Sequence, residues 1–262
     1  MTVWHSLEGQ LPVISLGMMR LLGVFVMLPL FTSRNLGGGM IRNGLIFVLG
    51  VPLWPVCQDY AINASSPLSE YLILYSQEIL IGVVIGFISA IPFWALDAAC
   101  YIIDTMRGSS MASIFNPQLG ETSSVLGVFV SQLSAVTFVS FGGFYAMLDM
   151  VYRSYILLPP GELLSFSTHF PGLLSQAWTM LFHLMLAFSL PSIIVMLLID
   201  ISLGLLNRSA QQLNVFFLAM PIKSTFSIFF LAIGLYYAFV HFQQQAKYLF
   251  SFLPPLIQNM SQ

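Results

Sequence analysis

The stretch 122–148 contains 27 consecutive residues without a single Asp, Glu, Lys, Arg or His. A helix needs about 20 apolar residues to cross the hydrocarbon core of a bilayer, so this stretch is long enough to span one. The composition agrees, because 58% of the residues are hydrophobic and 7% are charged, whereas about 25% of a soluble domain is charged. The sequence therefore predicts an all-α, polytopic membrane protein of kinked helices and helical hairpins.

Six main apolar runs follow one another along the chain, and we expect them to form a single membrane domain over residues 1–262. The runs cover 11–31, 41–56, 71–96, 125–148, 178–206 and 213–240. The second run is short and contains Pro52 and Pro55, which predicts a half-helix that needs protein around it. Prolines inside the runs favour kinks, although prolines are also generally commoner in membrane helices.

Charge and motifs exclude several classes of function. The net charge of -2 comes from eight basic and ten acidic residues spread along the chain, so no basic patch points to nucleic acid. The four histidines fit no hydrolase or metal-binding motif, and the two cysteines are too few for a metal site. We expect a non-enzymatic protein without a cofactor. Residues 1–10 lack the positive region of a signal peptide, so we expect the first apolar run to be retained.

Four charged residues lie inside the apolar runs, where a central charge costs about 2.5 to 3.5 kcal/mol on insertion scales. They are Arg20, Glu78, Asp200 and Lys223. Intramembrane ionisable residues usually face a protein interior or a water-filled cavity, so we expect Arg20, Glu78 and Lys223 to do so. For Arg20 and Lys223 the alternative is that the side chain extends to the membrane interface.

A charged segment and a small-residue segment follow the third run. Asp97 and Asp104 are seven residues apart on one helical face, and Asp104 precedes Arg107 by three, within reach of an ion pair. This pattern predicts an amphipathic helix with a wet side. The next residues favour a loop, which is either a linker or an element that occludes a pore: Gly108, Ser109, Ser110, Met111, Ala112, Ser113, Ile114 and Phe115.

A polar stripe follows the end of the fifth run. At 100° per residue Asp200, Asn207, Gln211 and Asn214 fall on one side of a helix. Buried amides need partners, so this face is predicted to meet another subunit or a water-filled path. The alternative is a helix contact inside the monomer.

The same stretch, LGLLNR followed by Gln211 and Asn214 and then by an apolar run with Pro221, resembles the FliR/SpaR/YscT family. This family is the T component of the type III secretion export apparatus and its flagellar counterpart. Further pieces resemble the family in the same order along 16–223: Pro29, Arg42-Asn43-Gly44, Gln77-Glu78, Ile91-Pro92-Phe93-Trp94, Asp104 to Gly108, and Asn116-Pro117. The stretch 91–96 and the Arg107-Gly108 pair look more like the injectisome branch than the flagellar branch.

The resemblance implies a core subunit of an export gate in the bacterial inner membrane, partly raised to the periplasmic side when assembled. It implies the R and S components as partners, together with other export apparatus proteins, inner-rod or needle proteins, and unfolded secreted proteins that pass through the gate. It also places a pore plug at 108–115, where Met111, Ile114 or Phe115 could make the seal. The competing hypothesis is a self-contained small-molecule or ion transporter, which the intramembrane charges and broken helices also suit.

Overall fold

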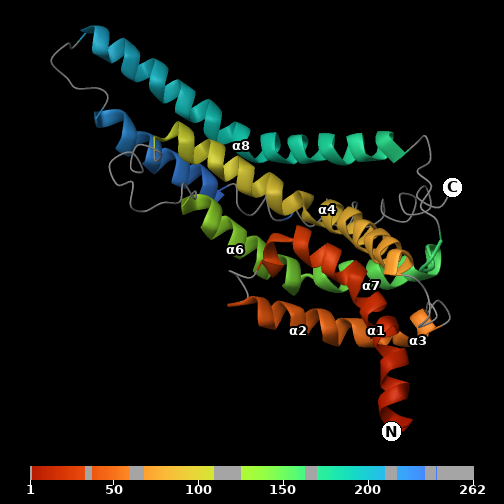
Figure 1. Cartoon of the computed structure of the whole chain (residues 1–262). Coiled ribbons are helices and arrows are strands. Elements are labelled where there is room, and N and C mark those ends of the chain that lie inside the picture. The colour runs from red at the N-terminus through yellow and green to blue at the C-terminus, as the bar shows by residue number, and fades with distance from the viewer. Residues whose placement is uncertain are drawn as a thin grey trace. The chain divides into compact units, whose positions relative to one another are not determined.

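Helices form every element in the part of the chain that the structure, a computed structural model, describes (Figure 1). The described residues are 2–32, 37–58, 68–108, 125–162, 170–209, 217–233 and 240. The elements are α1 (Thr2–Met27), η1 (Pro29–Phe31), α2 (Gly39–Gly50), η2 (Val51–Leu53), α3 (Trp54–Cys57), α4 (Leu68–Met106), α6 (Val125–Ser140), α7 (Gly143–Leu157), α8 (Phe170–Ser209) and the helix Phe217–Ile233. The predicted all-α class is confirmed.

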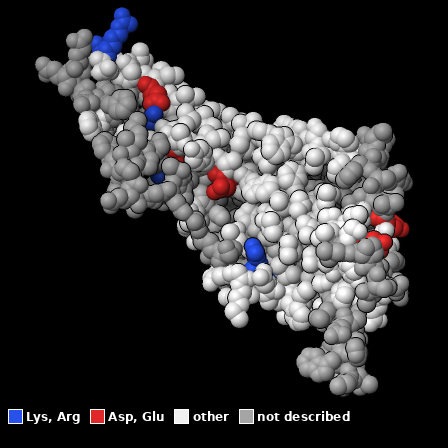
Figure 2. Space-filling view, viewed as in Figure 1, with Lys and Arg blue, Asp and Glu red and all other residues white. Residues whose placement is uncertain are grey.

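Three helical segments are long and apolar enough to cross a membrane, and the bent pair α6 and α7 would make a fourth if it counts as one span. The three segments are Gly39–Cys57, Ser69–Met106 and Phe170–Ser209. The lengths and compositions of these segments agree with the prediction of a polytopic membrane protein. Charged side chains are few and scattered on the face that Figure 2 shows.

The described elements divide into two compact units. Unit 1 contains α1 to α3, α4 up to Ile91, α7, and α8 up to Ala177. Unit 2 contains α4 from Pro92, α6, α8 from Trp178, and the helix Phe217–Ile233. One boundary therefore lies at a proline inside α4, where the helix lacks a backbone donor.

The core of unit 1 forms where α1, α4 and α7 meet. Phe25 of α1 stacks on Phe31 with ring centroids 4.1 Å apart, and Phe31 also contacts Phe144 of α7. Aliphatic side chains of the other two helices are buried as well, among them Ile85 of α4 and Val151 of α7. These side chains remove apolar area from solvent on all three helices, which fixes the position of α1 between its neighbours.

The core of unit 2 lies along the second half of α4. Phe93 packs edge to face against Phe138 of α6, with ring centroids 5.1 Å apart. Ala99, Cys100 and Ile103 are buried along the same helix. In α8 the direction of the ribbon changes near the middle of the helix (Figure 1), and Pro191 in the helix interior lacks an amide donor.

The uncharged run 125–148 differs from the sequence-based expectation, because the structure divides it. α6 ends at Ser140 and α7 begins at Gly143, and Gly142 between them has a φ of 77°. Residues other than glycine rarely adopt this left-handed backbone conformation. The lack of charge along this run predicts a continuous span, whereas the Gly142-Gly143 pair is the local signal for a break.

The segment 97–107 also differs in part from its prediction. It is helical as predicted up to Met106, as the last part of α4. Asp97 is exposed while Asp104 is buried, so the two carboxylates do not share a wet face. Asp104 turns inward because it has two partners in unit 2, which are described below.

The run 41–56 was expected to form a half-helix surrounded by protein. The structure instead makes Gly39–Cys57 a nearly continuous helical segment, and only 22% of its most apolar 18-residue window is buried within this chain. Pro52 lies in the short η2 turn and Pro55 in the first turn of α3, where a missing amide donor is tolerated.

Candidate functional site

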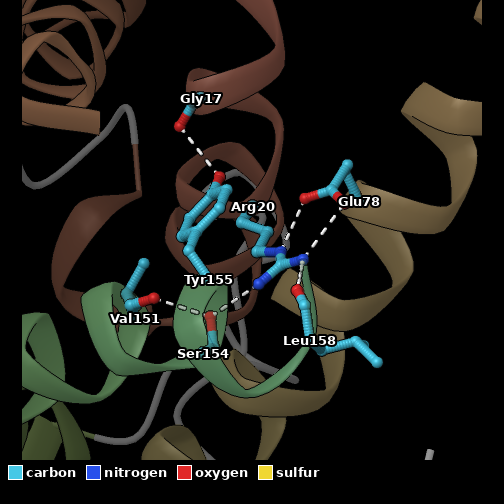
Figure 3. Close-up of polar contacts among 7 residues, drawn as sticks. All are labelled: Gly17, Arg20, Glu78, Val151, Ser154, Tyr155 and Leu158. Atoms are coloured by element: carbon cyan, nitrogen blue, oxygen red, sulfur yellow. Dashed lines mark hydrogen bonds and ion pairs between the residues drawn. The ribbon is translucent and has the colours of Figure 1, made fainter. Parts of the chain in front are cut away.

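The largest side chain that the described part of the chain buries completely is that of Arg20, which is 0% exposed (Figure 3). Its Nε donates to Glu78 Oε2 at 2.6 Å, and its Nη2 donates to Glu78 Oε1 at 3.1 Å. Nη1 donates to Ser154 Oγ at 3.0 Å, and Nη2 also donates to the Leu158 carbonyl at 2.6 Å. The guanidinium thus makes four hydrogen bonds to two other helices and the residue that follows α7.

An aromatic ring covers the face of the same guanidinium. Cζ of Arg20 lies 4.0 Å from the centroid of the Tyr155 ring, a distance that suits a cation–π contact. The Tyr155 hydroxyl donates to the Gly17 carbonyl of α1 at 3.1 Å, and Ser154 Oγ donates to the Val151 carbonyl at 2.6 Å. We call Arg20, Glu78, Ser154, Tyr155 and Leu158 the Arg20 cluster. It joins α1, α4 and α7.

Glycines bring α1 and α4 close enough for this bidentate pair. A Cβ added at Gly82 of α4 would collide with the carbonyl oxygen of Arg20, and one added at Gly86 would lie 2.8 Å from Cα of Val24. On the opposite helix, a Cβ at Gly23 would lie 2.8 Å from the Val83 nitrogen. Gly82 and Gly86 have the GxxxG spacing that allows membrane helices to approach closely.

The Arg20 cluster is a structural contact, because its ligands come from within the chain and the guanidinium lies wholly inside unit 1. The structure brings together two of the predicted intramembrane charges, and the side chain of Arg20 does not extend to the surface of this unit. A buried ion pair that lost one partner would leave an uncompensated charge. We therefore assign these residues to holding three helices in register.

Lys223, the third predicted charge, is paired as well. Its Nζ lies 2.5 Å from Asp200 Oδ1 of α8 and 3.4 Å from the Met106 carbonyl at the end of α4. The Lys223 side chain is 14% exposed and that of Asp200 is 43% exposed. The polar face that contains Asp200 was predicted to meet another subunit or a water-filled path, with a helix contact inside the monomer as the alternative. For Asp200 the structure shows such an internal contact, with Lys223 of the helix Phe217–Ile233.

Asp104 and Arg107 form the predicted ion pair, with Arg107 Nε 2.7 Å from Asp104 Oδ1. The other carboxylate oxygen of Asp104 accepts a hydrogen bond from the amide of Leu126, in the first turn of α6, at 3.2 Å. Asp104 is 3% exposed. The side chain of Asp104, which belongs to α4, thus links this helix to α6.

Gly108 ends α4 in the left-handed conformation, with a φ of 86°, and its amide donates to the Thr105 carbonyl at 3.1 Å. This is the usual role of a glycine just beyond a helix C-terminus. The other residues of the predicted plug, Ser109 to Phe115, lie outside the described residues, as do Gln211 and Asn214 of the predicted polar stripe. Asn207 is exposed near the end of α8.

Among the described residues, no three His, Cys, Asp or Glu side chains come close enough together to hold a metal ion. Cys57 and Cys100 are both buried free thiols. The described polar clusters contain ion pairs and hydrogen bonds whose donors and acceptors belong to the chain itself. Such an arrangement can hold helices together, and it presents no activated nucleophile.

Sequence reasoning found the charged residues of these clusters and missed their neutral partners. Ser154, Tyr155 and Leu158 lie between the fourth and fifth apolar runs and carry no signal that marks them as partners of a charge, and a backbone carbonyl or amide carries none at all. The available signal is the opposite sign of Arg20, in the middle of the first run, and Glu78, early in the third run. Two such charges are expected to pair.

Comparison with known proteins adds an independent observation. A family profile described as bacterial export proteins, family 1, matches residues 11–249. The secretion system apparatus protein SsaT of Salmonella typhimurium is 39% identical over 242 residues, which cover 92% of this chain and 93% of that protein. The Yop proteins translocation protein T of Yersinia pestis is 35% identical over 227 residues, 82% of each chain. The flagellar biosynthetic protein FliR of Bacillus subtilis is 27% identical over 245 residues, 90% and 91% of the two chains.

Proposed function

Because the chain belongs to family 1 of the bacterial export proteins, we propose that it is a non-enzymatic core subunit of a type III protein secretion export gate. The observation that carries the proposal is the extent of the similarity to the secretion apparatus protein SsaT, which spans more than nine-tenths of both chains. Identity to the secretion and translocation proteins, 39% and 35%, exceeds the 27% to the flagellar protein, which favours the injectisome branch.

In this proposal the subunit lies in the bacterial inner membrane as a multi-pass protein and joins the R and S components of the apparatus. Unfolded secreted proteins pass through the assembly, and the segment 108–115 contributes the plug that closes it. Support comes from the arrangement of charges: Arg20, Glu78, Asp200 and Lys223 all have partners within the chain. Most of the remaining surface of α8 is apolar and suited to lipid or to other membrane subunits.

Co-purification tests the assignment as a gate subunit. The tagged chain is extracted in mild detergent from cells that express the complete secretion system, and we expect small polytopic proteins to accompany it in fixed proportion. Extraction without such partners would contradict the proposal. Solute uptake by the purified chain alone, in liposomes, would instead favour the alternative of a self-contained transporter.

The plug assignment needs a separate test on the assembled gate. Residues 109–115 are replaced by a Gly/Ser linker of equal length, which retains Gly108 as the residue that ends α4. We expect the assembled gate to leak ions across the membrane. The matched control is the same replacement over 163–169, between α7 and α8, which should leave the gate closed. A gate that stays tight after the first replacement would exclude 109–115 as the plug.

A further inference from the structure

The second half of α4 has a carboxylate on the outer side of unit 2. Asp97 is exposed, whereas Ala99 and Cys100 beside it in the sequence are buried. The buried side of this half-helix also holds Phe93 against Phe138 of α6, with ring centroids 5.1 Å apart. Because this packing fixes the rotation of α4 about its own axis, the carboxylate of Asp97 stays on the outside.

Asp97 differs from other acidic side chains of the long apolar segments Ser69–Met106 and Phe170–Ser209. Three of these carboxylates each form an ion pair with a base of the same chain: Glu78 with Arg20, Asp104 with Arg107, and Asp200 with Lys223. Among the described residues, no basic side chain pairs with Asp97 and no donor reaches its carboxylate. A charge inside such a segment is unfavourable unless it meets water or a partner.

The position of Asp97 along α4 is well inside the helix. It precedes Met106, the last residue of α4, by nine residues, which corresponds to about 14 Å along the helix axis. The six residues that follow it, 98–103, carry no charge. The carboxylate is therefore isolated on an apolar stretch of α4 and separated from the next charge by almost two turns.

Two aromatic side chains flank Asp97 on the same side of α4. Trp94 precedes it by three residues and Tyr101 follows it by four, spacings that place side chains one above another on a helix. Tyr101 is 55% exposed and Trp94 is half-buried. The neighbouring Ala98 is small, which allows another helix to approach closely. We call Trp94, Asp97, Ala98 and Tyr101 the Asp97 face.

The chemistry of the Asp97 face favours a cation. A carboxylate attracts a positive charge, and the ring faces of tryptophan and tyrosine attract a cation through their quadrupoles. Lipid acyl chains carry no charge, so inside a bilayer a basic side chain of a polypeptide is the suitable source. A symmetric contact between two copies of this chain would use the same patch on both. It would bring two Asp97 carboxylates together, and like charges repel.

We propose that the Asp97 face is a docking surface for a helix of another membrane subunit, which presents a lysine or arginine side chain from its own apolar span. The carboxylate of Asp97 forms an ion pair across the interface, and the rings of Trp94 and Tyr101 pack against the basic side chain. The inference rests on the proposed function as a gate subunit. It adds the surface that is used and the chemistry of the partner.

Photo-crosslinking in cells that express the complete secretion system tests what covers this face. A photoreactive phenylalanine analogue replaces Tyr101, and the tagged chain is purified after irradiation. We expect an adduct with a small membrane protein, located by mass spectrometry within about two helical turns of a lysine or arginine in an apolar span. Adducts with lipid alone, with a second copy of this chain or with a span that lacks a base would overturn the proposal, as would the absence of any adduct.

Substitution of Asp97 tests whether its charge holds the partner. In the crosslinking strain we expect Asp97→Asn to reduce the yield of the adduct by about tenfold or more, because close charge pairs at interfaces couple by at least that factor. Asp97→Glu retains the charge and should retain the adduct. Asp149→Asn, which removes an exposed carboxylate of α7, is the matched control and should leave the yield unchanged. Equal yields from Asp97→Asn and Asp97→Glu would overturn the role of the carboxylate.

Reversal of both charges tests the ion pair directly. Asp97→Lys should abolish the adduct, and replacing the base of the crosslinked partner with aspartate in the same cells should restore it. No recovery in the doubly reversed strain would contradict an ion pair between the two positions.

Failure of this inference can be told apart from failure of the proposed function. If small polytopic proteins co-purify with the chain while Tyr101 yields only lipid adducts, the assignment as a gate subunit stands and the docking surface is wrong. If no such protein co-purifies and no crosslinked product contains another subunit, both proposals are wrong.

Discussion

Arg20 shows how a charge is accommodated within an apolar chain. An isolated ionised group in a low-dielectric interior is highly unfavourable, and the structure meets this with a carboxylate, a hydroxyl, a carbonyl and an aromatic face around one guanidinium. Arginine suits the position better than lysine would, because its planar fork can bind both oxygens of Glu78 at once. The geometry of the pair therefore depends on both residue types.

Replacing the carboxylate of Glu78 with an amide tests how strongly the fold depends on this pair. In Glu78→Gln the guanidinium of Arg20 stays buried without a counter-charge, and we expect unfolding in detergent to become easier by about 3 to 5 kcal/mol. The measurement is denaturant or thermal unfolding followed by near-ultraviolet circular dichroism. Asp149→Asn removes one partner of the exposed ion pair between Arg153 and Asp149 of α7, and it should change stability by less than about 1 kcal/mol. If both variants unfold alike, the Arg20 cluster has no special role.

A double variant that lacks both charges is a second test of the Arg20 cluster. Replacing both Arg20 and Glu78 with Met leaves apolar side chains of similar length in place of the charges, and no unpaired ion. Apolar replacement of a complete buried ion pair is often neutral or stabilising. We expect the double variant to be more stable than Glu78→Gln by at least about 1 kcal/mol in the same assay, because the Glu78→Gln variant retains the buried charge of Arg20.

At the residue scale, sequence alone predicts which charges must be satisfied but not what satisfies them. Arg20 and Glu78 stand out because few of the residues around them are polar. Tyr155 and Ser154 lie outside the apolar runs and resemble many other serines and tyrosines of the chain, and their contact with Arg20 depends on how α7 packs. Partners that are set by packing carry no local pattern in the sequence.

Close approach of α1 and α4 is a property of the two helices as elements. A Cβ at Gly82 would meet the carbonyl oxygen of Arg20, which belongs to backbone and cannot rotate away. Gly82→Leu should therefore separate the helices and break the Arg20–Glu78 pair. We expect a loss of several kcal/mol in stability, comparable to the worst overpacked cores, measured by thermal unfolding in detergent.

The control for this substitution is Gly204 of α8, where a Cβ would meet nothing within 4 Å. Gly204→Ala should stabilise its helix by up to about 1 kcal/mol, because alanine loses less backbone freedom than glycine. Opposite signs for the two substitutions would support the packing argument. Destabilisation by Gly204→Ala would show that helix-interior glycines in this chain are sensitive for another reason.

The break between α6 and α7 depends on the backbone of one residue. A Cβ at Gly142 would meet nothing within 4 Å, so any penalty of substitution there comes from its φ of 77°. We expect Gly142→Val to destabilise the fold by about 1 to 2 kcal/mol and Gly142→Asn to do so by less, since asparagine tolerates this region. The measurement is again unfolding in detergent. Equal effects would argue against a left-handed break.

For whole helices, sequence patterns predict which segments are helical, but they predict the first and last residues of each helix poorly. The apolar runs 71–96 and 178–206 lie within α4 and α8, both of which extend beyond them at each end. Hydropathy marks the lipid-compatible centre of a helix, whereas its ends depend on glycines such as Gly108 and on caps such as Asp104. Those signals are single residues and are easily passed over.

For the whole molecule, the useful contrast is between the helices that the chain buries and those that it leaves open. In the most apolar window of the segment Ser69–Met106, 67% of residues are buried, against 17% for Phe170–Ser209. The first helix is therefore a core element of this chain. The second presents an apolar surface that must be covered by lipid or by other subunits.

Site-specific photo-crosslinking shows whether lipid or another subunit covers the apolar surface of α8. A photoreactive phenylalanine analogue at Phe182, an exposed position of α8, should yield adducts with small membrane proteins when the secretion system is complete. At Phe25, which is 1% exposed, it should yield none. The products are resolved by electrophoresis and identified by mass spectrometry. Protein-free lipid adducts at Phe182 would show that this part of α8 faces the bilayer.

The Arg20 cluster also constrains the order in which the protein can be made. The carboxylate of Glu78 is 58 residues later in the chain than Arg20, and the Leu158 carbonyl is 138 residues later. During synthesis, α1 emerges from the ribosome with its guanidinium lacking every partner that it has in the finished fold. α1 therefore cannot reach its final packed arrangement when it first enters the membrane, and unit 1 is completed only after α7 has been translated.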